Sequence, residues 1–181
     1  MSARPPQLAH LEHLGDAARF ATQLHALIPQ CMLLENFTSE EVRELAQFME
    51  VFRAPEGVEV IREGDGGDFM VMVIEGRVEV SKRDRWNTPQ PIATVEPGRI
   101  LGEMSMIDGA ARFATCTAAG GPALVAVLSR ENLARTIVER PMLGAKLLME
   151  LVLMLSQRLR VTSDRLMQVL EEQGHPAAGH P

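Results

Sequence analysis

The spacing of apolar residues changes along the chain and separates helical parts from strand-like parts. Apolar residues recur near every third or fourth position from residue 8 to residue 28, which predicts an N-terminal helical arm over residues 1–28. Gly15 and Asp16 are expected to break this arm into two pieces, with Asp16 as a helix N-cap. Residues 1–7 contain two adjacent prolines and are expected to be disordered.

The middle of the chain has the pattern of a β-domain that follows a short helix. The helix begins at Thr38 or Ser39, because either hydroxyl can cap it ahead of the acids that follow. From residue 51 to about residue 127, short β-branched segments alternate with glycine-containing turns. Many short strands joined by regular turns predict an all-β sandwich or barrel. The expected strands cover residues 58–61, 69–74, 77–80, 91–95 and 123–128.

The C-terminal part has the pattern of two helices, the second of them long. Ser129 is expected to cap a helix that runs to about Arg140, and Pro141 opens the next helix as its first residue. We expect that helix to cover residues 141–173, followed by a flexible tail at residues 174–181.

The long helix carries two apolar stripes. The stripe of Leu147, Leu151 and Met154 can pack on the helix's own domain. The other stripe advances by alternating steps of four and three, which is the a/d pattern of a coiled coil. We therefore predict a parallel homodimer through the C-terminal helix; the alternative is a helix folded wholly onto its own domain. The a/d positions are Leu148, Val152, Leu155, Leu159, Thr162, Leu166, Val169 and Gln173.

Composition and charge narrow the classes of partner. The chain has 24 acidic and 18 basic residues, a net charge of -6, which argues against a nucleic-acid partner but permits one bound small anion. Cys31 and Cys116 form no disulfide framework and are expected to be reduced thiols in the cytoplasm. The N-terminus lacks an apolar leader, and the most apolar run, residues 147–155, is too short to cross a bilayer. No membrane partner is expected.

The stretch from residue 101 to residue 115 is the candidate binding site. It combines Gly102, Glu103 and a single arginine, Arg112, among residues that are otherwise mostly small or apolar. Gly102 allows close approach of the backbone to a ligand, and the residues after it resemble one helical turn whose first amides attract a phosphate. Arg112 opens a strand-like run and can direct its guanidinium at the same anion.

This stretch, GEMSMIDGAARFAT, resembles the phosphate-binding cassette of the cyclic-nucleotide-binding domain family. The runs IREGDGGD and IEG-x-V-x-V are similar to the family's strand–turn–strand signature. The resemblance implies an α+β fold, mainly β: a double-stranded β-helix, or jelly-roll barrel, over residues 29–140, with N-terminal helices and a long C-terminal dimerisation helix. The transcription factors of the family continue into a helix-turn-helix, so a stand-alone effector domain of the catabolite-activator type is expected.

The resemblance also implies roles for the residues of the stretch. Gly102 and Glu103 are expected at the ribose, with the Glu103 carboxylate accepting a hydrogen bond from the 2′-hydroxyl. The family commonly has Ser, Thr or Ala after the arginine; Phe113 stands there instead, and its ring either crowds the pocket or changes which base fits. The cyclic phosphate is expected to be held by Met104, Ser105, Arg112 and Phe113.

An apolar wall for the base is implied by matched positions in the barrel strands, although each position is equally well explained by core packing. In the resembling activators the long helix supplies polar side chains to the base, and Thr162 is the counterpart here, with Ser156 and Arg160 as weaker candidates. Trp86 is expected at an exposed hairpin tip. The candidates for the base pocket are Val80, Ile92, Ile100, Leu101 and Thr162.

These expectations favour a non-enzymatic regulatory protein. We expect a cytoplasmic homodimer that binds cAMP, with cGMP as the other candidate, and that signals to an unidentified protein partner through a rearrangement of helices. The alternative is a dimeric structural or interaction protein whose barrel no longer binds nucleotide. No metal cofactor is expected, because every histidine lies outside residues 29–174 and the His10–His13 pair lacks a third ligand. No nucleophile–base pair indicates an enzyme.

Overall fold

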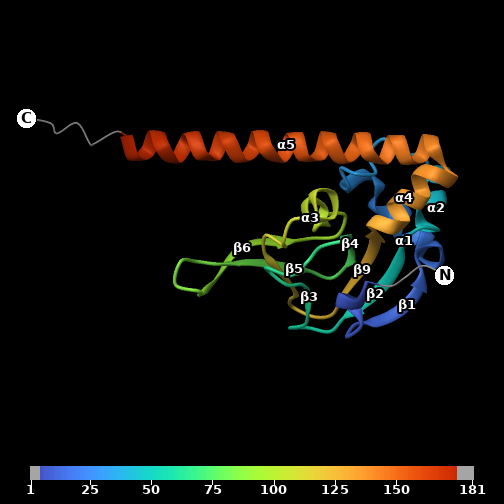
Figure 1. Cartoon of the computed structure of the whole chain (residues 1–181), viewed down its shortest axis with the longest axis horizontal. Coiled ribbons are helices and arrows are strands. Elements are labelled where there is room, and N and C mark those ends of the chain that lie inside the picture. Colours follow the sequence, from blue (N-terminus) through green and yellow to red (C-terminus); the bar gives the residue numbers. More distant parts are fainter. Residues whose placement is uncertain (1–4, 175–181) are drawn as a thin grey trace, which may run out of the picture.

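The computed structural model describes residues 5–174, with side chains up to residue 172, and its framework is two antiparallel sheets packed face to face (Figure 1). The strands are β1 (Glu12–Asp16), β2 (Glu50–Ala54), β3 (Glu59–Ile61), β4 (Phe69–Glu75), β5 (Val78–Arg83), β6 (Pro89–Val95), β7 (Ile100–Leu101), β8 (Thr115–Ala118) and β9 (Ala123–Ser129). The five-stranded sheet has the order β1-β2-β9-β4-β7 and the four-stranded sheet the order β3-β8-β5-β6. This jelly-roll arrangement confirms the expected α+β, mainly β fold.

The helices are α1 (Ala21–Leu27), α2 (Ser39–Ala46), α3 (Glu103–Asp108), α4 (Arg130–Glu139) and α5 (Pro141–Gly174), with short 3-10 helices η1 (Pro6–Leu8), η2 (Ala17–Phe20) and η3 (Ile28–Gln30). The expected caps are present. The Glu41 amide donates to the Thr38 hydroxyl, and the Thr38 amide donates to the Glu41 carboxylate at 2.7 Å, which is a capping box. The Ser129 hydroxyl caps α4 by accepting from the Asn132 amide.

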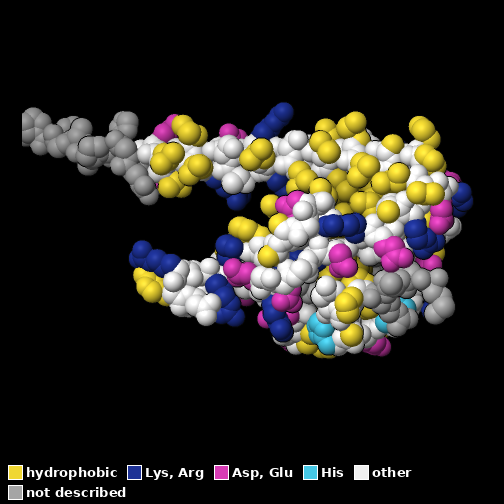
Figure 2. Space-filling model, in the orientation of Figure 1, with side chains coloured by type: hydrophobic (Ala, Val, Ile, Leu, Met, Phe, Trp, Pro, Cys, Tyr) yellow, Lys and Arg dark blue, Asp and Glu magenta, His cyan; other side chains and the backbone are white. Residues whose placement is uncertain are grey.

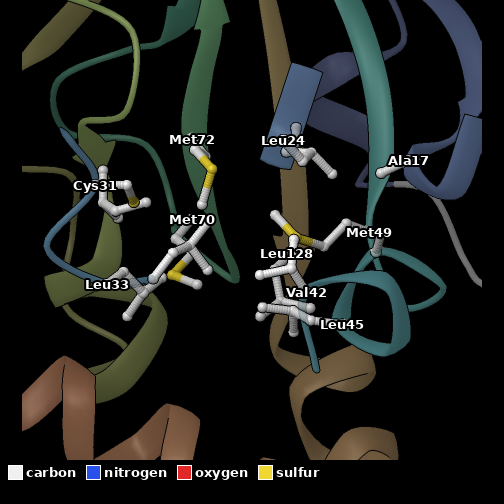
Figure 3. Packing of buried hydrophobic residues seen from close by; sticks show 14 of the residues in the cluster. Ala17, Leu24, Cys31, Leu33, Val42, Leu45, Met49, Met70, Met72 and Leu128 are labelled. Atoms are coloured by element: carbon white, nitrogen blue, oxygen red, sulfur yellow. The ribbon is translucent and has the colours of Figure 1, made fainter. Parts of the chain in front are cut away.

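The central strands β4 and β9 of the five-stranded sheet are buried on both faces, because helices cover the face that does not meet the other sheet. This explains why β4 and β9 are almost uninterrupted apolar runs. Between the sheets lie side chains such as Phe52, Val71 and Val125. On the other face, Leu128 of β9 packs with Leu45 of α2 in a second cluster (Figure 3).

The first part of the expected N-terminal arm is not helical. Residues Glu12–Asp16 form β1, which pairs with β2, and Pro6–Leu8 form a 3-10 helix where disorder was expected. Apolar residues three apart fit a helix, but here Leu8 and Leu11 are buried in the cluster between the sheets. The strand is favoured because it satisfies the backbone groups at the edge of β2.

Gly15 and Asp16 do mark a break, as expected. Gly15 has a φ of +105° and lies where the register of β1 shifts, a conformation that glycine adopts without strain. Asp16 then caps η2, because its carboxylate accepts from the Ala18 amide at 2.7 Å. From residue 17 to residue 30 the arm is helical.

All five expected strands are present, and β1, β2 and β7 are additional. The strand expected to open at Arg112 begins only at Thr115. The reason is that the backbone of Arg112 pairs with a loop: its amide donates to the Asp65 carbonyl at 2.9 Å, and its carbonyl accepts from the Gly64 amide at 3.0 Å. Trp86 is exposed in the turn between β5 and β6, as predicted.

Helix α5 begins at Pro141 and extends well beyond the barrel (Figure 1). The stripe of Leu147, Leu151 and Met154 is buried in the same cluster as Leu45 and Leu128, as predicted. Farther along, apolar side chains lie exposed on the projecting helix (Figure 2). Within residues 5–174, no helix is long and apolar enough to cross a membrane. The expected tail lies almost entirely outside the described residues.

Candidate functional site

A cavity lies where the four-stranded sheet, α3 and α5 meet. It brings the predicted stretch around Gly102 together with Arg112 and with residues of β3, β5 and β8. A neighbouring hollow below α5 shares three of its lining residues, Val80, Leu101 and Arg158. The cavity is lined by Ile61, Val80, Leu101, Gly102, Glu103, Met104, Ser105, Arg112, Phe113, Ala114, Cys116 and Arg158.

Helix α3 opens directly at the cavity, and Gly102 is its N-cap. Gly102 has a left-handed φ of +75°. A Cβ atom there would lie 2.6 Å from Arg112 Nη1 and 2.8 Å from Ile61 Cδ1, so only glycine fits without a shift of its neighbours. The first amides of α3, from Glu103 to Ser105, have no carbonyl partner within the helix, which makes them donors for an anion.

Arg112 is the buried cation of the site. Its side chain is held by two carbonyls: Nη1 donates to Gly102 at 2.7 Å and Nη2 donates to Phe69 at 2.8 Å, and the guanidinium also lies over the Phe69 ring. The residue is only 4% exposed. Burial lowers the pKa of the Arg112 guanidinium from its ordinary value, and the charge of Asp68 opposes that shift. Arginine nevertheless remains charged at physiological pH.

No carboxylate within the described residues forms an ion pair with Arg112. The direct partners of the Arg112 guanidinium are two carbonyls and the Phe69 ring, whereas Asp68, Glu103 and Asp65 act on its charge only through space. A bound anion beside this buried cation would therefore be favourable. The loop before β4 keeps this environment tight: a Cβ on Gly67 would lie 2.5 Å from Ser105 Cβ and 2.6 Å from Arg112 Nε. The sequence analysis did not single out Gly67.

Glu103 is buried, at 3% exposure, and forms an ion pair with Arg158 of α5. Arg158 also donates from Nη2 to the Ile100 carbonyl at 2.8 Å. The sequence analysis named other polar residues of this helix and missed Arg158. A signal existed: Arg158 continues by one more step of four the buried stripe that ends at Met154, so it faces the same domain.

Ser105 and Met104 complete the short helix. Ser105 is buried, and its hydroxyl donates to the Ala111 carbonyl at 3.4 Å; Met104 is exposed at the cavity edge. The far end of α3 is held by Arg130, the first residue of α4. Arg130 donates from Nε to the Met106 carbonyl at 2.7 Å and from Nη2 to the Ser105 carbonyl at 3.0 Å. Helix α3 is therefore tied directly to the C-terminal helices.

The structure brings only part of the expected base wall to the cavity. Val80 and Leu101 line it. Ile100 is buried beneath the helices instead, because neighbouring residues of a strand point to opposite faces. Ile92 lies exposed on β6, and Thr162 is exposed on α5 with its hydroxyl donating to the Arg158 carbonyl at 2.8 Å.

The rest of the apolar wall comes from Ile61, Ala114 and Cys116, which the sequence analysis did not propose. Burial raises the pKa of the Cys116 thiol to about 12, so it is neutral there. Phe113, the residue that follows Arg112, lies at the rim of the cavity and is exposed. Within residues 5–174, no group of three or more His, Cys, Asp or Glu could hold a metal ion.

Comparisons with known proteins identify the family of the chain and support its fold. The model of the cyclic nucleotide-binding domain family matches residues 51–140. A crystal structure of a cyclic nucleotide-binding domain from Methylobacillus flagellatus superposes with a TM-score of 0.80 at 35% identity, over 92% of this chain and 96% of that one.

Two curated relatives are larger proteins. A cyclic nucleotide-gated potassium channel of Mesorhizobium japonicum is 32% identical over 60% of this chain and 28% of its own length. The cyclic AMP receptor protein of Thermus thermophilus is 27% identical over 71% of this chain and 57% of its own length. The chain thus spans less than two thirds of either relative.

Proposed function

The chain belongs to the cyclic nucleotide-binding domain family, and we propose that it is a regulatory sensor that binds one cyclic nucleotide in each barrel. The proposed ligand is cAMP, with cGMP as the other candidate. The relative from Thermus thermophilus is described as a cyclic AMP receptor protein, which supports cAMP. The protein itself is proposed to have no enzymatic activity.

The observation that carries this proposal is the environment of Arg112. A guanidinium that is 4% exposed, donates to two carbonyls and has no ion pair to a described carboxylate favours a bound anion. The residues that carry the first amides of α3 line the same cavity. A cyclic phosphate carries one negative charge and several acceptor oxygens, so it suits a cation beside helix amides. We assign Met104, Ser105, Arg112 and Phe113 to the phosphate, as backbone or side-chain donors.

The ribose is assigned to Gly102 and Glu103. The Glu103 carboxylate already pairs with Arg158, so a 2′-hydroxyl that donates to Glu103 enters an existing ion pair between α3 and α5. Binding would therefore change the contact that holds α5 near the site. Such a shift of helix populations requires tighter binding to one state than to the other. Val80 and Leu101 remain our candidates for the base wall.

We further propose that α5 forms a parallel homodimer and presents a surface to a protein partner. The exposed a/d residues support this, since Leu159 is 69% exposed in the single chain. The two buried thiols, Cys31 and Cys116, support a cytoplasmic location. Neither a nucleic acid nor a membrane is proposed as partner. The curated relatives are longer proteins, and the chain matches only part of each. They therefore do not indicate which protein partner receives the signal of the sensor.

Isothermal titration with cAMP and with cGMP tests the proposal. The Arg112→Ala variant, which lacks the cation of the proposed phosphate site, is titrated in parallel. Binding near one per chain that disappears in the variant supports the sensor. One observation favours the alternative of a dimeric interaction protein: Glu103 is already neutralised by Arg158. In that case neither nucleotide would release heat or raise the melting temperature, because a ligand selective for the native state must stabilise it.

A further inference from the structure

Phe113 differs in exposure from both of its neighbours. Arg112 and Ala114 are buried, whereas Phe113 is 58% exposed although it lies at the rim of the cavity. A single exposed phenyl ring is common on protein surfaces, but this ring lines a cavity, where a bound molecule would remove its apolar surface from water. Its position beside the proposed phosphate residue indicates that the covering molecule is the ligand.

Lys82 of β5 holds this ring in place. Its Nζ donates to the Phe113 carbonyl at 2.7 Å and also lies 3.9 Å from the centroid of the Phe113 ring. Lys82 is itself fixed by Glu63, whose Oε1 lies 3.4 Å from Nζ and whose Oε2 accepts from the Arg83 amide at 2.9 Å. One ammonium group therefore contacts both the backbone carbonyl and the ring of Phe113.

The contact with Lys82 leaves part of the Phe113 ring available to a ligand. The ammonium group occupies one face of the ring by a cation–π contact, so the exposed remainder of the ring is what a ligand in the cavity meets. Aromatic rings prefer an offset-stacked or edge-to-face partner, and the flat heterocycle of a nucleobase is such a partner. Stacking of a base on an aromatic side chain is tolerant of base identity, because every base has a π-face.

We propose that Phe113 is the stacking platform for the base of the bound cyclic nucleotide and that Lys82 is its positioning residue. This inference rests on the proposed function. It assigns the base to the rim of the cavity, beside Val80, and it makes purine ring area a larger source of affinity than hydrogen bonds to base edges. Purine cyclic nucleotides should then bind more tightly than pyrimidine ones, with a small difference between cAMP and cGMP.

The test compares cAMP with ribose 3′,5′-cyclic phosphate, which has the same sugar and phosphate but no base. Phe113→Ala should weaken cAMP binding by about 5- to 150-fold, the measured range for loss of one stacked base, and should leave the base-free probe unchanged. Phe113→Trp should retain cAMP affinity. Lys82→Met should weaken cAMP binding by a smaller factor, because the ring remains but its position is no longer fixed.

Trp86, in the turn that follows the strand of Lys82, provides a matched aromatic control. It is also exposed, and Arg85 lies over its ring at 3.9 Å, but it does not line the cavity. Trp86→Ala should leave cAMP affinity unchanged. Because the Phe113 ring is mostly exposed, its variants are expected to fold, which thermal unfolding checks.

The possible results distinguish a failure of the stacking role of Phe113 from a failure of the proposed sensor function. If the wild type binds cAMP and Phe113→Ala binds it equally well or more tightly, the stacking role is overturned while the sensor function stands. Equal losses for cAMP and for the base-free probe would also overturn it, since the ring would then act on the phosphate. If the wild type binds neither probe, the proposed function fails and this inference fails with it.

Discussion

Arg158 on α5 forms an ion pair with Glu103, the first residue of α3, across 55 positions of sequence. This pair joins the helix that projects from the barrel to the helix that opens at the cavity. A ligand hydroxyl that donates a hydrogen bond to the Glu103 carboxylate would share that carboxylate with Arg158. The position of α5 and the occupation of the site are therefore linked through one contact.

Arg158→Gln should uncouple α5 from the site. The substitution removes the cation that compensates buried Glu103, but Arg158 is itself 41% exposed, so we expect a modest loss of about 1 kcal/mol in unfolding free energy. In the wild type, cAMP should change hydrogen-exchange protection in α5; in Arg158→Gln that change should disappear. Arg165→Gln, an equal change of charge at an exposed position farther along α5, is the control and should behave as wild type.

Gly102→Ala should destabilise the protein and abolish cAMP binding. A Cβ there meets Arg112 Nη1 at 2.6 Å in a backbone conformation with φ of +75°. Gly57 has a similar φ of +79° with nothing within 4 Å of a Cβ, so Gly57→Ala carries the backbone strain alone. We expect a loss of about 1 kcal/mol for Gly57→Ala and about 3 kcal/mol for Gly102→Ala in urea unfolding. Equal losses would mean that the crowding at Arg112 has no effect.

Cys116 should make stability fall at alkaline pH. Burial raises the pKa of its thiol from 9.0 to about 12 in the folded protein. Above pH 9 the unfolded chain loses this proton while the folded chain keeps it, so the contribution is complete below pH 9 and is lost as pH rises from 9 towards 12, by up to about 1.4 kcal/mol per pH unit. Urea unfolding of the wild type and of Cys116→Ala between pH 8 and pH 10 measures the difference. Identical slopes would refute the prediction.

Leu159→Glu should abolish the proposed homodimer and give a monomer. Leu159 is 69% exposed in the single chain and lies at an a/d position of α5, where a charge cannot be buried against a second helix. Gln157→Glu places the same charge at an exposed position outside the a/d stripe and is the control. Sedimentation velocity distinguishes the two states. A wild type that sediments as a monomer at micromolar concentration would refute the homodimer itself.

The barrel and the helix caps could be predicted because they depend on local signals. Glycine turns between short apolar runs gave the five expected strands, and Thr38 followed by Glu41 gave the capping box. The arm was mispredicted for a physical reason. Leu8 and Leu11 have helical spacing, but the edge of β2 offers backbone partners that only the tertiary structure reveals.

The candidate site was predictable where its residues are contiguous and not where they are distant. Gly102, Glu103 and Arg112 lie within eleven residues of one another and meet at the cavity. Arg158 reaches the cavity from α5 and Lys82 contacts Phe113 from β5. The buried stripe of α5 indicates only that Arg158 faces its own domain, and no spacing in the sequence shows that either residue lies at the site. Ile100 borders the neighbouring hollow and not the cavity itself, which the sequence of a two-residue strand could not indicate.

Titration calorimetry of the wild type and of Arg112 variants with cAMP is the decisive measurement for the sensor function. We expect the wild type to bind about one cAMP per chain and Arg112→Ala to show no binding. Arg112→Lys should bind weakly, because lysine keeps the charge but lacks the planar fork that donates to the Gly102 and Phe69 carbonyls. Arg85→Ala, at the exposed hairpin, controls for loss of one positive charge and should bind as the wild type does. Equal affinity in Arg112→Ala, or a wild type that shows neither heat nor a rise in melting temperature with cAMP or cGMP, would contradict the sensor function and favour a dimeric interaction protein.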